Sequence, residues 1–451
     1  MTIQRVRASA YIELLVKARS RIVSTTGRVL IPYQAEWGAP NQAIDMADDS
    51  ERLKESGKLV DVLELAAESG ATVIGYRVSN GEEKAASVTV ADSYTIEARY
   101  PGTRGNDFEY MVRPALIDET KKEIVIRDTK GVYDTETYLV ADKAAAVEAL
   151  KKSAMVRFKD TGVTVLADVA YTKLDGGTTG TATLAATDWN RIFNRVYGLT
   201  FDTIYLSTTD PAVQAAAKQW LLDRRDKGHK LATLVVAGPA ATDGDIEAHN
   251  ARSRAMNARY IINCSLAGEH TNGKTYTSVE WAAWVAGLVA GTPANKSFTG
   301  VKVPMTQAKV DWSHSEVLKG LAEGTLMATR DGYDYVIEQA INTLTTLGPN
   351  EREDFGKIRV SATIDQVMND IYDAGKKWKA KLDNDKEGRS MFIAAVLEYL
   401  KIRAQQKAIA DKFSFSENPD KTSENDYAYF KLGAKPLDAI EIFYTDWEVE
   451  K

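Results

Sequence analysis

The spacing of apolar residues divides the chain into regions of different texture. Between residues 186 and 330, short apolar runs alternate with segments whose apolar residues recur every three to four positions. The runs predict buried strands, and the segments predict amphipathic helices, such as the one that carries Trp189, Ile192 and Phe193 on one face. Strands that alternate with helices are typical of a mainly parallel sheet covered on both faces. Residues 29–86 show the same pattern, so we predict one α/β domain built from 29–86 and 186–330.

The texture changes between residues 87 and 185. Short runs rich in β-branched and aromatic residues follow one another here, separated by turns such as Pro101-Gly102. Runs of this kind between turn residues predict strands. We therefore predict a small β-rich domain that is inserted into the α/β domain. The runs are 87–90, 94–98, 108–112 and 123–126.

Residues 331–436 predict a third domain, of the α+β class. Lys357–Ala362 alternates in the manner of a strand, and Ile364–Tyr372 has the spacing of a short helix. Gly388–Lys412 predicts a long helix. Tyr427–Leu432 predicts a strand after it, and the alternation of apolar residues after Leu437 predicts one more.

The two ends of the chain carry opposite charge. Residues 1–28 hold six basic residues and one acidic residue, whereas residues 437–451 hold five acidic residues and one basic residue. A frayed terminus and an edge strand protected by its charges are the simpler interpretations. We predict instead two extended β arms that bind another protein surface, because neither segment has enough apolar residues to form a core alone. Their apolar residues are Tyr11, Ile12, Leu14, Val16 and Ile22 in one arm and Ile440, Ile442, Tyr444, Trp447 and Val449 in the other.

The composition is that of a soluble globular protein of several domains. The chain has 451 residues, a hydrophobic fraction of 44%, a charged fraction of 27% and a net charge of −6. This mild charge gives no reason to expect direct binding of nucleic acid. The longest apolar run, Trp281–Ala290, is about half of a membrane span, and the first residues lack the apolar core of a signal peptide. We expect the chain to be synthesised in a reducing cytoplasm. We do not expect it to insert into a membrane.

The residue types that carry chemistry are scattered along the chain. None of the four histidines lies three to five residues from another, and the single cysteine, Cys264, sits in an apolar run that predicts a buried strand. The acidic stretch from Asp383 resembles the start of a calcium loop, but its twelfth position is Ala394 instead of glutamate. The common nucleotide-binding and hydrolase motifs are also missing. We predict no catalytic residue, no cofactor and no metal site.

Four phrases resemble the phage tail sheath proteins. Val285–Thr299 contains an "AG-x-x-AGTP" phrase followed by "N-x-S-x-T", and Tyr100–Asn106 reads "YPGTRGN". Trp37–Pro40 reads "WG-x-P". The last phrase, "INTLTT … K-I-R-V … ID", spans Ile341–Asp365. The four occur in the order found in that family, and the match is closest to sheaths of Gram-positive phages, prophage particles and contractile bacteriocins.

The resemblance implies a structural subunit of a contractile tail sheath. Such subunits form stacked helical rings around an inner tube, with arms that complete a sheet in neighbouring subunits and an insertion that faces outward. The implied partners are other copies of the chain, the inner tube protein, and baseplate and tail terminator proteins. The implied location is a virion tail or phage-tail-like particle, assembled in the bacterial host cytoplasm. On contraction the sheath would shorten and drive the tube through a cell envelope.

The residues themselves are compatible with this implication. An open helical assembly needs two different surfaces on each subunit, and a basic arm and an acidic arm are two such surfaces. The predicted helix 388–412 is rich in basic residues, so Lys401, Arg403 and Lys407 are candidates to face an acidic tube. Two other classes remain as alternatives: an α/β enzyme with a β-rich insertion, and a baseplate or adhesion protein of a similar particle.

Overall fold

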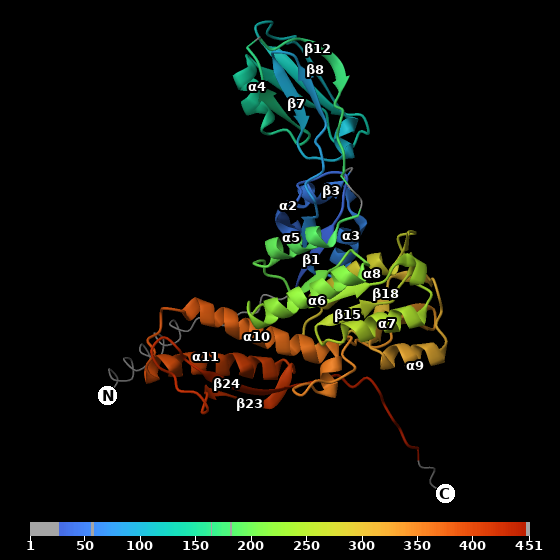
Figure 1. Cartoon of the computed structure of the whole chain (residues 1–451), viewed down its shortest axis with the longest axis vertical. Coiled ribbons are helices and arrows are strands. Elements are labelled where there is room, and N and C mark those ends of the chain that lie inside the picture. Colours follow the sequence, from blue (N-terminus) through green and yellow to red (C-terminus); the bar gives the residue numbers. More distant parts are fainter. Residues whose placement is uncertain (1–26, 56–57, 164, 181–182, 448–451) are drawn as a thin grey trace, which may run out of the picture. The chain divides into compact units, whose positions relative to one another are not determined.

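The structure is a computed structural model of the whole chain (Figure 1). The chain divides into two compact units. The sandwich unit comprises residues 28–217 and 279–288, and the arm unit comprises the rest of the chain. The boundary falls inside two helices, α6 (Pro211–Asp226) and α8 (Ser278–Gly291). The structure describes residues 27–55, 58–163, 165–180 and 183–447. Within these residues no helix is long and apolar enough to cross a membrane.

A sheet with the strand order β2-β5-β1-β13 lies in the sandwich unit. Its strands are parallel except β2, which runs antiparallel to β5. Five of the six residues of β1 are buried, as expected for a strand covered on both faces. The strands are β1 (Arg28–Tyr33), β2 (Ala43–Asp45), β5 (Thr72–Arg77) and β13 (Thr203–Tyr205), with helices α2 (Met46–Asp49), η1 (Ser50–Leu53), α3 (Asp61–Glu68) and α5 (Ala186–Val196) and the small hairpin β3 (Lys54–Glu55) and β4 (Lys58–Leu59).

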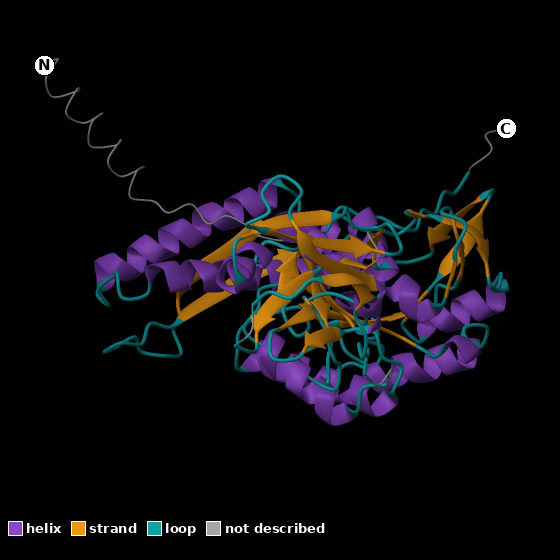
Figure 2. Ribbon diagram, turned by 90° about the horizontal axis from the view of Figure 1, so that it is seen from above, coloured by secondary structure: helices purple, strands orange, loops and turns teal. Residues whose placement is uncertain are grey.

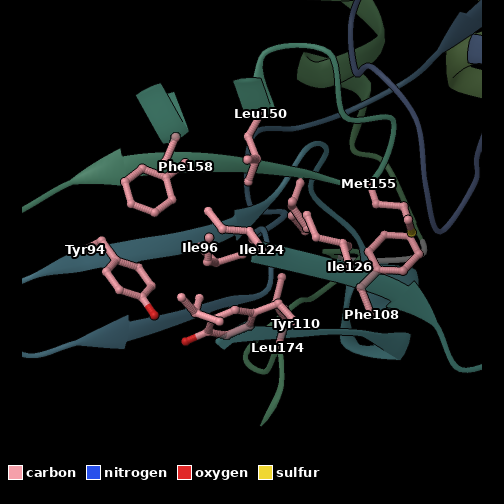
Figure 3. Packing of buried hydrophobic residues seen from close by; sticks show 14 of the residues in the cluster. Tyr94, Ile96, Phe108, Tyr110, Ile124, Ile126, Leu150, Met155, Phe158 and Leu174 are labelled. Carbon is pink, nitrogen blue, oxygen red and sulfur yellow. The ribbon is translucent and has the colours of Figure 1, made fainter. Parts of the chain in front are cut away.

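The segment between β5 and α5 folds as a β-sandwich. A four-stranded sheet, β10-β9-β8-β12, and a three-stranded sheet, β11-β7-β6, are both antiparallel. Alternate residues of β7 point into the core, where Tyr94 stacks on Phe158 with ring centres 5.0 Å apart (Figure 3). The elements are β6 (Ser87–Val90), β7 (Tyr94–Ala98), η2 (Thr103–Asp107), β8 (Phe108–Pro114), β9 (Lys122–Asp128), β10 (Glu136–Val140), α4 (Lys143–Leu150), β11 (Val156–Asp160) and β12 (Val169–Lys173).

The arm unit begins with a parallel sheet of order β14-β15-β20. All four residues of β15 are buried, and helix α7 packs on β15 and β20. Two small antiparallel sheets follow, β17-β16-β19 and β18-β22-β21. The elements are β14 (Thr233–Ala237), η3 (Ala240–Thr242), α7 (Ile246–Met256), β15 (Ile261–Cys264), β16 (Gly268–His270), β17 (Thr275–Tyr276), β18 (Lys302–Val303), β19 (Met305–Ala308), α9 (His314–Ala322), β20 (Thr325–Leu326), β21 (Ala328–Asp331) and β22 (Asp334–Ile337).

The last part of the arm unit is an α+β region. It contains η4 (Glu353–Gly356), two long helices, α10 (Ile358–Trp378) and α11 (Lys386–Gln405), and the hairpin of β23 (Ile409–Glu417) and β24 (Phe430–Pro436). Helix α11 packs on β23. The predicted combination of an α/β sheet with a C-terminal α+β region is confirmed at this level, and the sheet is mixed because β2 runs antiparallel to β5.

Several predicted elements of this last region are wrong. Lys357–Ala362 is not a strand, because the first turns of α10 begin at Ile358 and continue through the predicted short helix. The helix predicted to Lys412 ends at Gln405, and the chain turns at Lys407 (φ 59°) into β23. The strand predicted at 427–432 lies at Phe430–Pro436. Residues 437–447, predicted as a strand, form none within this chain and are drawn as loop in Figure 2.

Candidate assembly site

The segment after β24 exposes most of its large apolar side chains. Ile442, Phe443, Tyr444 and Trp447 are between 60% and 92% exposed, and Ile440 is 75% exposed. Figure 1 shows this segment as an extended stretch that leaves the C-terminal region. A folded domain normally covers such side chains, and several exposed together mark a surface that binds a partner. We call residues 437–447, with the four that follow them, the C-terminal arm.

The hairpin of β23 and β24 offers open edges for such a partner. Among the described residues, no third strand pairs with either of these two strands. One face of the hairpin packs on α11, where Phe415 stacks on Phe430 with ring centres 5.3 Å apart and Phe392 lies 5.2 Å from Phe430. The hairpin is therefore held firmly while its outer backbone groups can pair with an added strand.

An apolar groove lies between α10 and the hairpin. It has a volume of about 350 Å³, and its lining includes Ile364, Val367 and Met368 of α10 and Leu432 and Ala434 of β24. Arg352, Asp354 and Lys435 also line it, and the Arg352 guanidinium pairs with the Asp354 carboxylate at 2.9 and 3.0 Å. The groove is therefore suited to apolar side chains, which the C-terminal arm supplies.

The arm itself is tied to the unit by one carboxylate. The side chain of Glu441 is only 8% exposed, and its Oε1 accepts hydrogen bonds from the hydroxyls of Ser297 and Thr299, both at 2.8 Å. Its Oε2 pairs with the Lys357 ammonium at 2.6 Å. Burial alone would raise the pKa of Glu441, but the hydrogen bonds from Lys357, Thr299 and Ser297 outweigh it and lower that pKa. We call these four residues the Glu441 clasp.

The phrases that resemble sheath proteins meet around the Glu441 clasp. Ser297 and Thr299 belong to the "N-x-S-x-T" phrase, and Lys357 opens the "K-I-R-V" phrase. The Thr299 hydroxyl also accepts the backbone N–H of Ala340 at 2.8 Å, directly before the "INTLTT" phrase. Asn295, the first residue of "N-x-S-x-T", donates its side-chain amide to the carbonyl of Gln406 at 2.7 Å. Through these contacts, residues of the phrases hold Glu441 and the segments next to it in place.

Two other phrases, "WG-x-P" and "YPGTRGN", lie close together where the chain enters and leaves the β-sandwich. We call this junction, around Lys84 and Thr178, the neck of the sandwich. Arg77, which is 1% exposed, donates to the carbonyls of Gly38 at 2.6 Å and Pro101 at 2.9 Å. Trp37 packs edge-on against Tyr100, with ring centres 5.3 Å apart. The neck is closed by backbone hydrogen bonds between segments far apart in sequence: Lys84 and Thr178 exchange two, and Ser87 donates one to Asp175.

The basic candidates on α11 differ in their surroundings. Lys401 and Lys407 are exposed, although Lys407 lies beyond the end of the helix. Arg403 is 14% exposed and lies 3.6 Å from Asp370 and over the ring of Tyr399. Arg403 therefore has covered partners in its own unit, whereas Lys401 is exposed and Lys407 has an exposed contact with Asp411, 4.0 Å away.

The buried polar residues of α7 serve packing of the sheet beside it. Asn263 of β15 donates to the carbonyl of His249 and the hydroxyl of Ser253, each at 2.8 Å. Burial lowers the pKa of His249 and raises that of Cys264 to about 12. The nearby cavity, which Asp243 and Trp312 line, measures about 10 Å³ and has room for little more than a water molecule. Within the described ranges, no group of three His, Cys, Asp or Glu side chains could hold a metal ion.

The structure describes four of the residues predicted for the C-terminal arm. Sequence patterns did not identify Glu441 as the residue that binds the arm to its unit. Ile440, Ile442, Tyr444 and Trp447 are exposed on the arm. From the sequence alone, Glu441 was treated only as one of the acidic residues of the arm. Its position between Ile440 and Ile442 was the one local signal that set it apart from the other acidic residues. The predicted residues that lie outside the described part of the chain are Tyr11, Ile12, Leu14, Val16, Ile22 and Val449.

Exposed apolar side chains on the arm and unpaired strand edges on the hairpin are features typical of a protein that assembles with other subunits. The chain matches three family models: a phage tail sheath protein beta-sandwich domain over residues 79–181, a central domain over 182–343 and a C-terminal domain over 350–450. The chain belongs to the phage tail sheath family. It is a structural subunit of a contractile tail sheath.

Relatives cover both the whole chain and parts of it. The phage-like element PBSX protein XkdK of Bacillus subtilis is 24% identical and spans 99% of this chain and 98% of its own. A tail sheath protein of Clostridium phage phiCD119 is 29% identical over 34% of this chain and 43% of its own. The crystal structure of a sheath tail protein from Desulfitobacterium hafniense has the same fold, with a TM-score of 0.72, 21% identity and coverage of 93% of this chain and 98% of that one.

Proposed function

We propose that the subunit polymerises into stacked helical rings around an inner tube, and that its two terminal arms link neighbouring copies. The C-terminal arm carries this proposal, because it presents a row of exposed apolar side chains that its own unit leaves uncovered. Such a segment is more stable when another subunit covers it. Residues 1–28 would be the second arm, and their basic charge would select among partners for the acidic one.

The receiving surface of a neighbouring copy would be the β23–β24 hairpin and its groove. A strand added to an open edge gains backbone hydrogen bonds, and its alternate side chains set the register. In the arm, Phe443 and Trp447 are large enough to fill much of a groove of about 350 Å³.

The remaining assignments follow from the same proposal. The α/β domain would comprise 29–86 and 186–330, the outward-facing insertion 87–185, and the domain nearest the tube 331–436. The arms would hold subunits together while their bodies move as rigid units, so that the sheath shortens and drives the tube through a cell envelope. Baseplate and tail terminator proteins would contact the ends of the sheath. Assembly would take place in the cytoplasm of the bacterial host.

Deleting the arms tests the proposal directly. Removal of residues 442–451, which leaves the Glu441 clasp in place, or of residues 2–20, is expected to leave a folded subunit that no longer forms tubes in the electron microscope. The domain cores lie elsewhere, so the melting temperature of the subunit should change by only a few degrees. The matched control replaces Leu116 and Ile117 by serine, because these exposed apolar residues of the sandwich have no role in the proposed linkage.

Three results would contradict the proposal. One is normal polymerisation of either truncated protein. Another is a turnover activity that survives in a discrete monomer or dimer, which would favour an α/β enzyme. A protein that assembles only as a ring of fixed size would instead favour a baseplate component.

A further inference from the structure

The C-terminal arm consists of a fixed root and a free segment. The root begins at Leu437, whose backbone N–H donates to the carbonyl of Ala408 at 2.9 Å. It ends at Glu441, whose side chain is 8% exposed. Ile440, within the root, is 75% exposed, and every residue from Ile442 to Trp447 is exposed. Glu441 is therefore the last described residue of the arm whose side chain its own unit covers.

The Glu441 clasp is well suited to hold that position. Its three donors come from two stretches separated by about sixty residues, so they fix the carboxylate from different sides. The hydroxyls are themselves held: the backbone N–H of Thr299 donates to the Ser297 hydroxyl at 3.2 Å, and the Thr299 hydroxyl accepts the N–H of Ala340. Charge-assisted hydrogen bonds to a buried carboxylate are stronger than those between neutral groups.

We propose that Glu441 is the positioning residue that sets where the C-terminal arm leaves the subunit. This inference rests on the proposed function of the arm. With the clasp closed, only the residues from Ile442 onward reach out, and ten extended residues span roughly 33 Å. Without the clasp, the fifteen residues from Leu437 onward would span roughly 50 Å, and the arm could leave in many directions. The clasp thus restricts both the reach and the direction of the link.

The main alternative is that the clasp only adds stability to the subunit. The two roles differ in what they predict for the arm. A stabilising contact, when removed, lowers the melting temperature without changing where the remaining arm points. A positioning residue, when removed, changes the spread of arm positions even where the melting temperature stays the same.

Distances between two spin labels separate these roles. One label is placed at Met391→Cys on α11 and the other at Ile440→Cys, since both positions are exposed and the native Cys264 is 0% exposed. Labelled protein is diluted with unlabelled full-length protein, so that only distances within one subunit are measured. The expected distribution is narrow in the parent protein and about twofold wider in E441A. The variant D438N, which changes an exposed carboxylate of the same root, should remain narrow.

Two further variants guard against a trivial result. If E441A fails to fold, K357M removes the ammonium from the other side of the clasp and should widen the distribution in the same way. The exchange K357E/E441K restores an opposite-charge pair and should narrow the distribution again. An unchanged width in E441A or K357M, or no narrowing in the exchange variant, would overturn the inference.

A second measurement connects the clasp to assembly. Sheaths of E441A should show a more variable helical rise than sheaths of D438N in electron micrographs. A uniform rise with a widened distance distribution would overturn the positioning role. If no variant and no parent protein forms sheaths, the proposed function fails, while the spin-label distances still decide whether Glu441 holds the root.

Discussion

Arg225 forms a bidentate ion pair with Asp365 through both terminal nitrogens of its guanidinium. The two N–H···O distances are 2.6 and 2.7 Å, and the side chains are 5% and 10% exposed. Arg259 adds a third contact to the same carboxylate at 2.9 Å. Burial would raise the pKa of Asp365, but the two arginines outweigh it and lower that pKa. The pair joins α6 to α10 across 140 residues of sequence, so it secures the helix that borders the groove.

Replacing Asp365 by alanine should therefore destabilise the protein strongly. Breaking a buried ion pair leaves uncompensated charge inside, which costs about 3–5 kcal/mol. The control is D373A on the same helix, where the Asp373–Lys376 pair is about half exposed and contributes only about 0–1 kcal/mol. The free energy of unfolding in urea measures both. Equal effects of the two substitutions would show that the buried pair contributes no more than a surface one.

Acid should weaken the protein through the same carboxylate. A lowered pKa in the folded state means that the folded protein binds fewer protons than the unfolded chain. The resulting stability is complete above the unfolded pKa of about 3.9 and is lost as the pH falls through the folded pKa. At pH values under about 4, the unfolding free energy of the parent protein should therefore decrease. That of D365A should decrease less over the same range. Parallel curves for the two proteins would contradict this assignment.

Gly102 should not tolerate alanine. Its φ of +139° is rarely adopted by other residues, and a Cβ there would run into the carbonyl oxygen of Glu36. The strain should cost roughly 1–3 kcal/mol of unfolding free energy. Gly198 is the control, because it has an ordinary backbone and open space around it, so G198A should be nearly neutral. A neutral G102A would mean that the neck can shift without loss.

Lys401 and Lys407 can be tested as contacts with an acidic tube. Reversing both to glutamate should reduce tube-templated assembly, and raising the salt concentration should shrink the difference from the parent protein. The double reversal of the exposed Lys151 and Lys152 in the sandwich makes the same change in net charge and should leave assembly intact. Arg403 is left unchanged because its ion pair with Asp370 would confound the result. Unchanged templated assembly of K401E/K407E would remove α11 as a tube contact.

Sequence was a good guide where local signals decide the structure. Helix α8 begins at Ser278 and ends at Gly291, two residue types that are common at the start and the end of helices. Asp210 and Pro211 mark the start of α6 in the same way, since the Asp210 carboxylate accepts the backbone N–H of Ala212 at 2.8 Å. In both cases the residues that determine the boundary lie within one turn of it.

The failures fall where distant residues decide. The start of α10 alternates like a strand, but it is held as a helix by contacts such as Arg225–Asp365, which no local pattern reveals. The end of α11 has neither glycine nor proline to mark it, because Lys407 adopts the left-handed turn instead. The strand predicted after Leu437 needs a neighbouring edge, and among the described residues no strand pairs with residues 437–447.

The Glu441 clasp shows the same limit at the site. Its apolar neighbours were visible as an arm, but the carboxylate is defined by hydroxyls about 140 residues earlier in the chain. The "N-x-S-x-T" phrase could be read as a signature without any indication of what its hydroxyls bind. Only the fold brings the phrase and the arm together.

The closed neck of the sandwich makes that domain exchangeable. Lys84 and Thr178 exchange two backbone hydrogen bonds, so the two ends of the intervening segment lie side by side. A domain whose termini are adjacent can be removed, or replaced by an unrelated one, without stretching the chain that carries it. The sandwich can therefore be changed without altering any residue of the clasp or the hairpin. An engineered version could display a guest protein at the same junction.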